Sequence, residues 1–507
     1  MSLRLCVRST FKTFHKQNST FIMPKSAGII VIGDEILKGQ TKDTNSIFLC
    51  QLLHSLGVSL KRITVIGDDI QEISNEVRIF SNAYDYVLTS GGIGPTHDDK
   101  TFDGVANAFN ESVVANQTLV DLCTRYFGNK PMNSPEMKMA HIPESAVLHF
   151  GHDASTGRSF RFPVIAVKNV FLFPGIPSLL EKSAVSLKHL FKGEGQFYTN
   201  KILVDELETG IAKYLSACQE KYHSVGVAIG SYPDLFNNYY KVKVVVESVN
   251  SQATEEATKY LMDSIPQHLV VKDYVENPTE LQGKDVFKKT FTSQSLSKKV
   301  DEAVQIIEEA LRRYSFNELC IGFNGGKDCT ALLHLFYAVL CRKYPEGKEP
   351  ILSLYVKDPN PFDEVRRFME ESCKRYKLKL VTIDDKIKPA LEKLKLEHPE
   401  VKATLMGTRY TDPYSRNLAA FSPTDDDWPS YMRVNPMLDW SYHDVWEFLR
   451  SLHLPYCVLY DRGYTSLGSK ENTKRNEKLM YIDEDSRIKY RQAYTLQDED
   501  FERNGRL

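Results

Sequence analysis

Two long stretches of the chain alternate short hydrophobic runs with amphipathic segments, which is the pattern of strands that alternate with helices. The first stretch predicts strands at 27–33, 60–66 and 86–89, and a helix with hydrophobic positions between 47 and 56. The second begins with a helix in which hydrophobic residues recur every three or four positions from 296 to 311. It then predicts strands at 319–323, 351–356, 380–383 and 403–406 and helices at 330–342, 363–376 and 388–396. Each stretch therefore predicts a parallel sheet with helices on both faces.

Residues 196–272 lie between these stretches and follow another order. Their pattern predicts strands at 197–204, 224–231, 240–246 and 268–271, and helices at 209–221 and 254–264. The order βαββαβ is typical of a small ferredoxin-like sandwich. A polar stretch that contains Pro278 and Gly283 follows and predicts a linker.

The fold class expected from these patterns is α/β, with two parallel-sheet domains and a small α+β (ferredoxin-like) subdomain between them. A length of 507 residues agrees with about three domains. The expected divisions are a targeting leader at 1–26, a first α/β domain at 27–195, the α+β subdomain at 196–275, a linker at 276–297 and a second α/β domain at 298–507.

The N-terminal leader is basic, since no acidic residue precedes Asp34 and Arg4, Arg8 and Lys12 are interleaved with hydrophobic and hydroxyl residues. This composition is typical of an organelle-targeting presequence, and equally of a plain basic tail. We expect a cytoplasmic protein with a mitochondrial form directed by this leader. Met23 is an alternative start for a form without it.

The overall composition excludes several classes of protein. The chain has 64 Lys and Arg against 66 Asp and Glu, so its net charge of −2 argues against a polybasic nucleic-acid coat. Its nine cysteines include no C-x-x-C pair, which argues against a disulfide framework and a sulfur-ligated metal. No hydrophobic run approaches the roughly 18 residues of a membrane-spanning helix.

The segment 319–330 carries the decisive motif, a predicted strand that runs into N-G-G-K-D at 324–328 and then into a hydrophobic helix. The two glycines let the backbone turn tightly and expose consecutive N–H groups, and the start of a helix adds a positive dipole end. Lys327 adds a mobile cation, so the segment predicts a cradle for a pyrophosphate. A plain turn between strand and helix is the alternative, and the spacing is not that of a Walker loop.

This segment resembles the PP-loop of ATP pyrophosphatases, S-G-G-x-D-S, with Asn324 in place of the first serine and Cys329 in place of the last. In this variant form it resembles the eukaryotic FAD synthases, FMN adenylyltransferases with a phosphoadenosine-phosphosulfate-reductase-like fold. Further blocks match that family in order from about residue 300 onwards. They are G-T-R-Y-T-D-P at 407–413, T-D-D-D-W-P at 424–429, N-P-M-L-D-W at 435–440, G-Y-T-S-L-G at 463–468, Y-R-Q-A-Y at 490–494 and E-R-N-G-R at 502–506.

The resemblance implies that FMN attacks ATP to give FAD and pyrophosphate, with Mg²⁺ bound to ATP and no structural metal. It also implies FMN and ATP as small-molecule partners, client flavoproteins that receive FAD, and no nucleic acid. The residues that it implicates are Asn324, Lys327, Asp328 and Arg409 in catalysis, Gly325, Gly326, Gly407 and Thr408 in phosphate binding, and Asp412, Asp425, Trp428, Arg503 and Arg506 in flavin binding.

The residues themselves leave structural alternatives open. Arg409 suits a phosphate but also a surface ion pair, and an Asp before Pro, such as Asp412, usually caps a turn. Trp428 suits ring stacking but also packing in a core. Ser441 and Asp444 predict a helix capping box. The adenylyl transfer needs no enzyme nucleophile, so we expect Cys329 to be a packed residue.

Other functions remain as rivals. A protein that only binds nucleotide, as a scaffold or a molybdopterin-handling protein, is the first. A sulfonucleotide reductase is the second, although that class uses a cysteine near the C-terminus and no cysteine follows Cys457 here. A tRNA-thiolating enzyme is disfavoured, because the chain has neither paired cysteines nor a basic RNA-binding stretch.

The first α/β domain carries a second glycine-rich motif. T-S-G-G-I-G-P-T-H-D-D-K-T at 89–101 resembles the signature of molybdopterin-binding and competence-inducible proteins, and G-D-E-I-L-K-G at 33–39 and P-G-I-P at 174–177 agree with it. Binding of a pterin phosphate, hydrolysis of a dinucleotide such as FAD, and a regulatory scaffold all remain open. The expected site residues are Asp34, Gly91, Gly92, Gly94, Thr96, Asp98 and Asp99.

Overall fold

The computed structural model describes residues 24–152, 157–160, 162–279, 286–287, 291, 293–345, 350–483 and 485–506. Most of the expected targeting leader at 1–26 lies outside these residues. The chain divides into two compact units, of which the first ends at 201 but also includes 213–230 and 245–264, while the second includes 202–212, 231–244 and everything from 265 onwards. Within the described part of the chain, no helix is long and hydrophobic enough to cross a membrane.

The first unit contains a six-stranded sheet in the order β2-β1-β3-β8-β7-β6, in which the first four strands are parallel and the last two antiparallel. Its strands are β1 (Ser26–Ile32), β2 (Ser59–Ile66), β3 (Tyr86–Ser90), β6 (Val147–His149), β7 (Val164–Val167) and β8 (Val170–Phe173), and a separate pair is formed by β4 (Val113–Ala115) and β5 (His141–Pro143). Its helices are α1 (Asp34–Leu37), α2 (Asn45–Ser55), α3 (Ile70–Ala83), α4 (Thr101–Phe109), α5 (Gln117–Phe127), α6 (Pro135–Lys138) and α7 (Pro177–Ser186).

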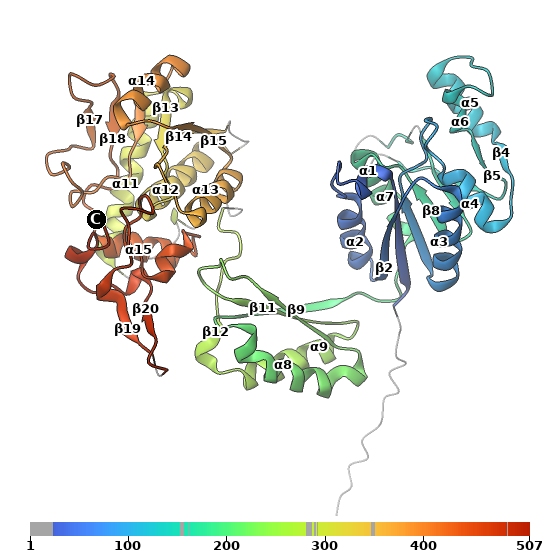
Figure 1. Ribbon diagram of the computed structural model, residues 1–507, viewed down its shortest axis with the longest axis horizontal. Coiled ribbons are helices and arrows are strands. Elements are labelled where there is room, and N and C mark those ends of the chain that lie inside the picture. The colour runs from blue at the N-terminus through green and yellow to red at the C-terminus, as the bar shows by residue number, and fades with distance from the viewer. Residues whose placement is uncertain are drawn as a thin grey trace, which may run out of the picture. The chain divides into compact units, whose positions relative to one another are not determined.

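The hydrophobic run of β1 supplies both faces of this sheet. Ile29 packs in a core with residues of α2 and α7, whereas Ile30 packs in a second core with residues of α3 and α4. Figure 1 shows these two pairs of helices on opposite sides of the strands. Because successive residues of a strand point to opposite faces, an unbroken hydrophobic run suits a sheet that is covered on both sides. The expected α/β class is confirmed.

The small subdomain has the expected order βαββαβ. It consists of β9 (Tyr198–Val204), α8 (Glu208–Tyr222), β10 (Ala228–Pro233), β11 (Val242–Ser248), α9 (Ser251–Ser264) and β12 (Val270–Val271), with sheet order β10-β11-β9-β12. Strand β10 begins four residues later than predicted, because residues 223–225 form a turn of 3-10 helix that ends at Gly226, whose φ is +78°. A glycine adopts this left-handed conformation without steric cost.

The second unit contains the second six-stranded sheet, in the order β15-β14-β13-β16-β18-β17 and parallel except for β17. Its strands are β13 (Leu319–Gly322), β14 (Ile351–Val356), β15 (Leu378–Ile383), β16 (Ala403–Leu405), β17 (Phe421–Pro423) and β18 (Met432–Val434), followed by the hairpin β19 (Met480–Ile482) and β20 (Ile488–Tyr490). Its helices are α11 (Gln294–Arg313), α12 (Lys327–Lys343), α13 (Asp363–Tyr376), α14 (Ile387–Glu397) and α15 (Tyr442–Ser451), and short 3-10 helices include η5 (Val458–Arg462) and η8 (Glu499–Phe501).

Two details of this unit differ from the prediction. The linker expected at 276–297 is partly core, since Val286 and Phe291 are buried among the hydrophobic residues of the second unit. Its last residues belong to α11, which begins at Gln294 because the Ser293 side chain accepts the N–H of Leu296 as a helix cap. The capping box of Ser441 and Asp444 at the start of α15 is confirmed.

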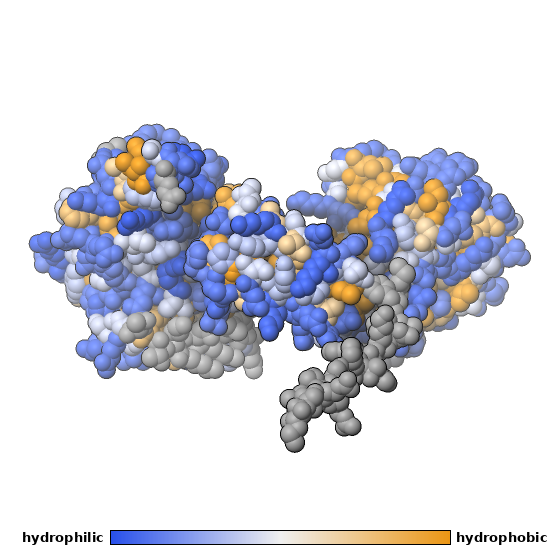
Figure 2. Space-filling model, turned by 90° about the horizontal axis from the view of Figure 1, so that it is seen from below, coloured by the Kyte–Doolittle hydropathy of each residue, from blue (hydrophilic) through white to orange (hydrophobic). Residues whose placement is uncertain are grey.

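One face of the surface carries its hydrophobic residues in separate patches. Figure 2 shows this face, which is mainly hydrophilic. Separate patches of this kind are ordinary for a folded protein, so this face by itself does not locate a site.

Candidate active site

The predicted site residues of the second unit lie at one edge of its sheet. Strands β13 and β16 are parallel neighbours, with Leu319 paired to Ala403 and Ile321 to Leu405. The loops that follow the two strands therefore leave the sheet at the same edge. Ligands of open parallel sheets bind at this carboxyl edge, so N-G-G-K-D and G-T-R are brought together at the place that suits a ligand.

The N-G-G-K-D loop is a tight turn that leads directly into a helix. Gly325 has a φ of +75°, and Gly326 is the N-cap residue of α12. The side-chain oxygen of Asn324 accepts the Gly326 N–H at 3.0 Å, and the hydroxyl of Tyr460 accepts the Lys327 N–H at 3.0 Å. Two of the amides expected to face a phosphate are thus held by the protein's own groups here.

Four charged side chains form a compact cluster beside this loop. Lys327 Nζ lies 3.0 Å from Asp328 Oδ2, and it also contacts a carboxylate oxygen of Glu502. Arg409 Nε lies 2.8 Å from Asp328 Oδ1, and Arg409 Nη2 donates to both carboxylate oxygens of Glu502 at 2.7 Å. Asp328 and Glu502 therefore each contact both Lys327 and Arg409, and of these four residues Lys327, Asp328 and Arg409 were predicted from the sequence.

Burial makes these charges strongly interdependent. The side chains of Lys327 and Arg409 are each 2% exposed and that of Glu502 is 10% exposed, so Lys327 is not the mobile cation that the sequence suggested. Burial raises the pKa of the Asp328 carboxyl, but the charges of Lys327 and Arg409 lower it, and the net shift is downward. Burial lowers the pKa of Arg409, while Asp328 and Glu502 raise it, and the net shift is upward.

The cluster retains unused hydrogen-bonding capacity. Within the described part of the chain, Asp328 Oδ1, Arg409 Nε and Arg409 Nη1 are buried without a hydrogen-bond partner, so the 2.8 Å contact between Asp328 and Arg409 is an ion pair that lacks hydrogen-bond alignment. Buried polar atoms are normally satisfied, and an unsatisfied guanidinium suits an anionic ligand. The cluster is therefore the part of the second unit best suited to a phosphate.

Gly407 keeps the two loops in contact. A Cβ atom at this position would lie 2.9 Å from the backbone nitrogen of Cys329 and 3.0 Å from the carbonyl carbon of Asp328. Only a glycine lets the β16 loop approach the first turn of α12 this closely. Thr408 lies half-buried between Gly407 and Arg409.

We expect Gly407→Ala to lower the free energy of unfolding by about 1–3 kcal/mol, because the added methyl group meets backbone that cannot rotate away. It should also lower the FAD formation that the family resemblance implies at least tenfold, by separating Arg409 from Asp328. Gly195→Ala is the matched control, since nothing lies within 4 Å of its Cβ position. Chemical denaturation and product formation measure the two effects. Equal stability and equal product formation in the two variants would show that the close contact at Gly407 is not needed.

Cys329 is a packed residue at the start of α12, as expected. Its thiol donates to Asn324 Oδ1 at 3.0 Å and to the Gly326 carbonyl at 3.1 Å. Burial raises its pKa to about 12, which leaves the thiol neutral near pH 7 and unsuited to act as a nucleophile. Cys329→Ala should keep the FAD formation that the resemblance implies within threefold of the rate of the parent chain and cost about 1 kcal/mol of stability. A loss of more than a hundredfold in turnover at retained stability would assign the thiol a chemical role.

The residues expected to bind flavin fall into two groups. Asp412 Oδ2 accepts the Arg409 N–H at 2.9 Å, and Asp412 Oδ1 lies 3.5 Å from Arg503, which joins both residues to the cluster. Arg506 is half-buried and donates to Thr473 Oγ1 at 3.3 Å. Asp425 is largely exposed and Trp428 half-buried in a turn after β17, and no described contact connects either to the cluster.

The glycine motif of the first unit forms another loop at a sheet edge. Gly91 and Gly92 follow β3 with φ of +105° and +64°, and a Cβ at Gly91 would lie 2.1 Å from the Ile32 carbonyl oxygen at the end of β1. Thr96 donates from its N–H and hydroxyl to Asp99 Oδ2, at 2.8 and 2.5 Å. The Asp34 N–H donates to Asp68 Oδ2 at 3.1 Å, and burial raises the pKa of Asp68.

The remaining predicted residues of this motif are more open. Asp98 is exposed and lies 3.8 Å from His97, and Gly94 lies against the carboxylate of Asp99. No three His, Cys, Asp or Glu side chains among the described residues are grouped closely enough to hold a metal ion.

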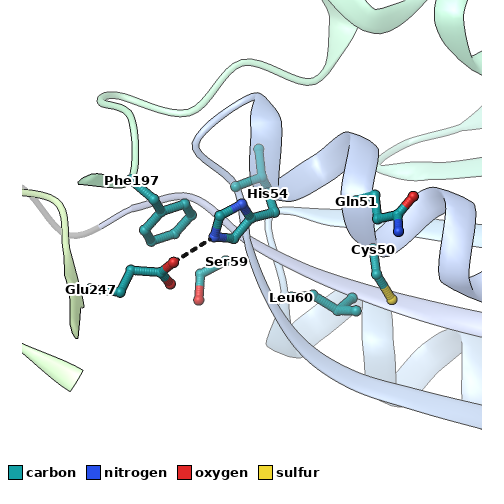
Figure 3. A pocket seen from close by; sticks show the side chains of 8 residues that line it. Cys50, Gln51, His54, Ser59, Leu60, Phe197 and Glu247 are labelled. Carbon is teal, nitrogen blue, oxygen red and sulfur yellow. Dashed lines mark hydrogen bonds and ion pairs between the residues drawn. The ribbon is translucent and has the colours of Figure 1, made fainter. Parts of the chain in front are cut away.

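A surface pocket of the first unit contains none of the predicted site residues. It is lined by residues of α2 and by Phe197 and Glu247, among others (Figure 3). The His54 ring stacks on Phe197 with ring centres 4.7 Å apart, and its Nε2 lies 2.9 Å from Glu247 Oε2. These contacts satisfy the polar groups locally, so the pocket does not compete with the charge cluster as the site.

Two residues at the charge cluster were not predicted from the sequence as site residues. Glu502 belongs to the matched block E-R-N-G-R, but a Glu in a polar tail gives no signal of burial. Tyr460 precedes the matched block G-Y-T-S-L-G and is buried, with its hydroxyl on the Lys327 N–H. An acidic side chain inside a matched block is the signal that could have indicated Glu502, whereas Tyr460 lies outside the blocks and gave no such signal.

Three family models match consecutive parts of the chain. A probable molybdopterin binding domain matches residues 28–191, a FAD synthase middle domain matches 196–274, and a phosphoadenosine phosphosulfate reductase domain matches 318–475. They fall on the first α/β domain, the small subdomain and the second α/β domain, in that order. The resemblances of both glycine motifs are confirmed.

Relatives extend this match to nearly the whole chain. A probable FAD synthase of Caenorhabditis briggsae is 37% identical over 505 residues, which cover 95% of this chain and 96% of that protein. A probable FAD synthase of Caenorhabditis elegans is 37% identical and covers 95% and 97%. A crystal structure of Candida glabrata FMN adenylyltransferase with FMN and AMPCPP is 25% identical, covers 45% of this chain and 97% of that one, and has a TM-score of 0.42. With both nematode proteins aligned along almost their full length, this chain belongs to the family of FAD synthases.

Proposed function

We propose that the second α/β domain transfers AMP from ATP to FMN and releases FAD and pyrophosphate. A phosphate oxygen of FMN attacks the α-phosphorus of ATP, and the bond from that phosphorus to the β-bridging oxygen breaks. Its electron pair leaves with pyrophosphate. The observation that carries the proposal is the buried cluster of Lys327 and Arg409 with Asp328, at the carboxyl edge of a parallel sheet and at the start of α12. Membership of the FAD synthase family supplies the substrates.

The protein's contribution to this reaction is positional and electrostatic. Two anionic substrates must be held with the attacking oxygen in line, and the charge that develops on pyrophosphate must be compensated. The positive end of α12 and the unsatisfied Arg409 Nη1 suit that charge. We propose that Mg²⁺ enters with ATP as part of the substrate, and we assign no protein ligand to it.

Incubation of the full chain with FMN, ATP and MgCl₂ tests the proposal, with FAD and pyrophosphate quantified separately. Equal amounts of the two products support it. Binding of nucleotide without FAD formation would support the scaffold alternative, and thiol-dependent release of sulfite from a sulfonucleotide would support the reductase alternative. The full chain is the correct material, because Tyr239 of the small subdomain donates to the carbonyls of Leu449 and Leu454 within the second unit.

For the first α/β domain we propose a hydrolytic role toward FAD or a regulatory role. The carboxylates of Asp34, Asp68 and Asp99 around a glycine loop support hydrolysis of a dinucleotide that a divalent cation accompanies. Release of FMN and AMP from FAD without added pyrophosphate, and its loss in Asp99→Asn, would distinguish hydrolysis from regulation.

We further propose that the protein works in the cytoplasm with a mitochondrial form and delivers FAD to client flavoproteins, which localisation and transfer assays would test.

A further inference from the structure

The C-terminal segment from η8 to Arg506 is bound to the second unit through its backbone. The carbonyl of Glu502 accepts the Thr465 hydroxyl at 2.6 Å, and the carbonyl of Phe501 accepts the side-chain amide of Asn476 at 2.8 Å. The Gly505 carbonyl accepts the Lys474 N–H at 2.8 Å. These bonds dock the tail on residues 465–476 without any contribution from the Glu502 side chain.

The Glu502 side chain makes a separate and more demanding set of contacts. Its carboxylate binds two cations from different elements, Lys327 at the start of α12 and Arg409 in the loop after β16. The whole residue is 8% exposed. Burying a carboxylate is unfavourable unless its partners compensate, so a tail that needed only docking could use its backbone bonds alone. These two buried ion pairs indicate that the negative charge of Glu502 has a functional role at the cluster.

The position of Glu502 in the chain, close to Arg503 and Arg506, suggests what this role is. The next residue, Arg503, is half-exposed and reaches Asp412, the residue that also holds the Arg409 backbone. Arg506 packs over Gly468, where a Cβ would meet its guanidinium at 1.8 Å. The short segment that carries both tail arginines therefore also supplies the carboxylate that binds Lys327 and Arg409.

We propose that Glu502 is a positioning residue that couples the tail arginines to the phosphate-binding cations. Its carboxylate holds Lys327 and Arg409 in one geometry relative to Arg503 and Arg506, which would face the flavin nucleotide. This inference rests on the proposed adenylyl transfer. The alternative is that Glu502 only occupies the place of a substrate phosphate and is displaced when ATP binds.

The two readings predict opposite kinetics for Glu502→Gln, which keeps the shape and removes the charge. Positioning predicts that kcat/KM for FMN falls at least tenfold. If Glu502 only occupies the place of a substrate phosphate, KM for ATP should fall while kcat and KM for FMN stay unchanged. That result would overturn the proposal. Glu499→Gln is the matched control from the same tail, since Glu499 accepts the Tyr442 N–H and no described contact joins it to Lys327 or Arg409. Its FMN kinetics should stay within twofold of the parent chain.

A double-mutant cycle separates positioning from a general structural effect. If Glu502 acts through the tail, Glu502→Gln combined with Arg503→Ala should lose little more FMN efficiency than the more damaging single variant. Losses that multiply would show that the two residues act independently and would overturn the proposal. Glu502→Asp keeps the charge, should recover part of the FMN efficiency, and replaces Glu502→Gln in the cycle if the latter does not fold. FAD formation by the parent chain is measured first, so that failure of the proposed function is recognised separately.

Discussion

Arg409→Ala is expected to lower the rate of FAD formation by a factor of roughly 10² to 10³, the loss typical of removing one electrostatic donor from an active site. Arg409 is buried and pairs with Asp328 and with both oxygens of Glu502. Its removal leaves two carboxylates with Lys327 as their only partner in the cluster. Because a buried carboxylate is costly when one of its cationic partners is removed, the free energy of unfolding should fall by about 3–5 kcal/mol. Steady-state kinetics and urea denaturation measure the two quantities.

Two control variants test whether the effect of Arg409→Ala is specific to this side chain. Arg409→Lys retains the charge but loses the planar guanidinium, whose Nε faces Asp328 while its Nη2 donates to both oxygens of Glu502, so it should recover stability better than turnover. Arg416→Ala removes an exposed arginine from the same loop and should remain within twofold of the parent chain. If Arg409→Ala and Arg416→Ala have similar turnover, the charge cluster is not the site of adenylyl transfer.

Asp328→Ala is expected to lower turnover about a hundredfold, because Asp328 is the carboxylate that lies between Lys327 and Arg409 at the start of α12. Its side chain is 23% exposed, so the loss of stability should be smaller than for Arg409, at roughly 2 kcal/mol. Asp328→Asn keeps the shape and removes the charge, and it should resemble Asp328→Ala in turnover. Turnover near that of the parent chain in both variants would exclude an electrostatic role.

The lowered pKa of Asp328 gives this prediction a pH dependence. Its ionised form is stabilised in the folded chain relative to an unfolded aspartate, whose pKa is about 3.9. The contribution to stability is therefore complete above that value and is lost as the pH falls through the lower folded value. Between pH 6 and 8 the difference in stability between the parent chain and Asp328→Asn should stay constant, and it should shrink in acid. Denaturation at several pH values measures it.

Much of the architecture follows from the hydrophobic pattern. The unbroken hydrophobic run 27–33 predicted β1, because both faces of its sheet are covered. The hydrophobic residues spaced at three and four from 296 to 311 predicted α11, because this spacing places them on one face of a helix. The motif N-G-G-K-D predicted the loop between β13 and α12. The family resemblance implicated Lys327, Asp328 and Arg409, but the pairing of β13 with β16 that brings their loops to one place was learned from the structure.

The features that could not be predicted depend on long-range packing. Burial of Lys327 is decided by Glu502, which is 175 residues away in sequence. The linker pattern at 276–297 is polar overall, yet Val286 and Phe291 enter the core because a hydrophobic surface lies within their reach. The start of β10 was missed because a turn that ends in a left-handed glycine has no period to recognise.

The separation between Lys327 and Glu502 has a consequence for synthesis of the protein on the ribosome. Lys327, Asp328 and Arg409 are all translated well before Glu502, so the emerging domain first holds two cations against one carboxylate. Contacts between residues so far apart in sequence form late, because a long loop must close first. The charge balance of the cluster is thus reached only after residue 502 has been translated.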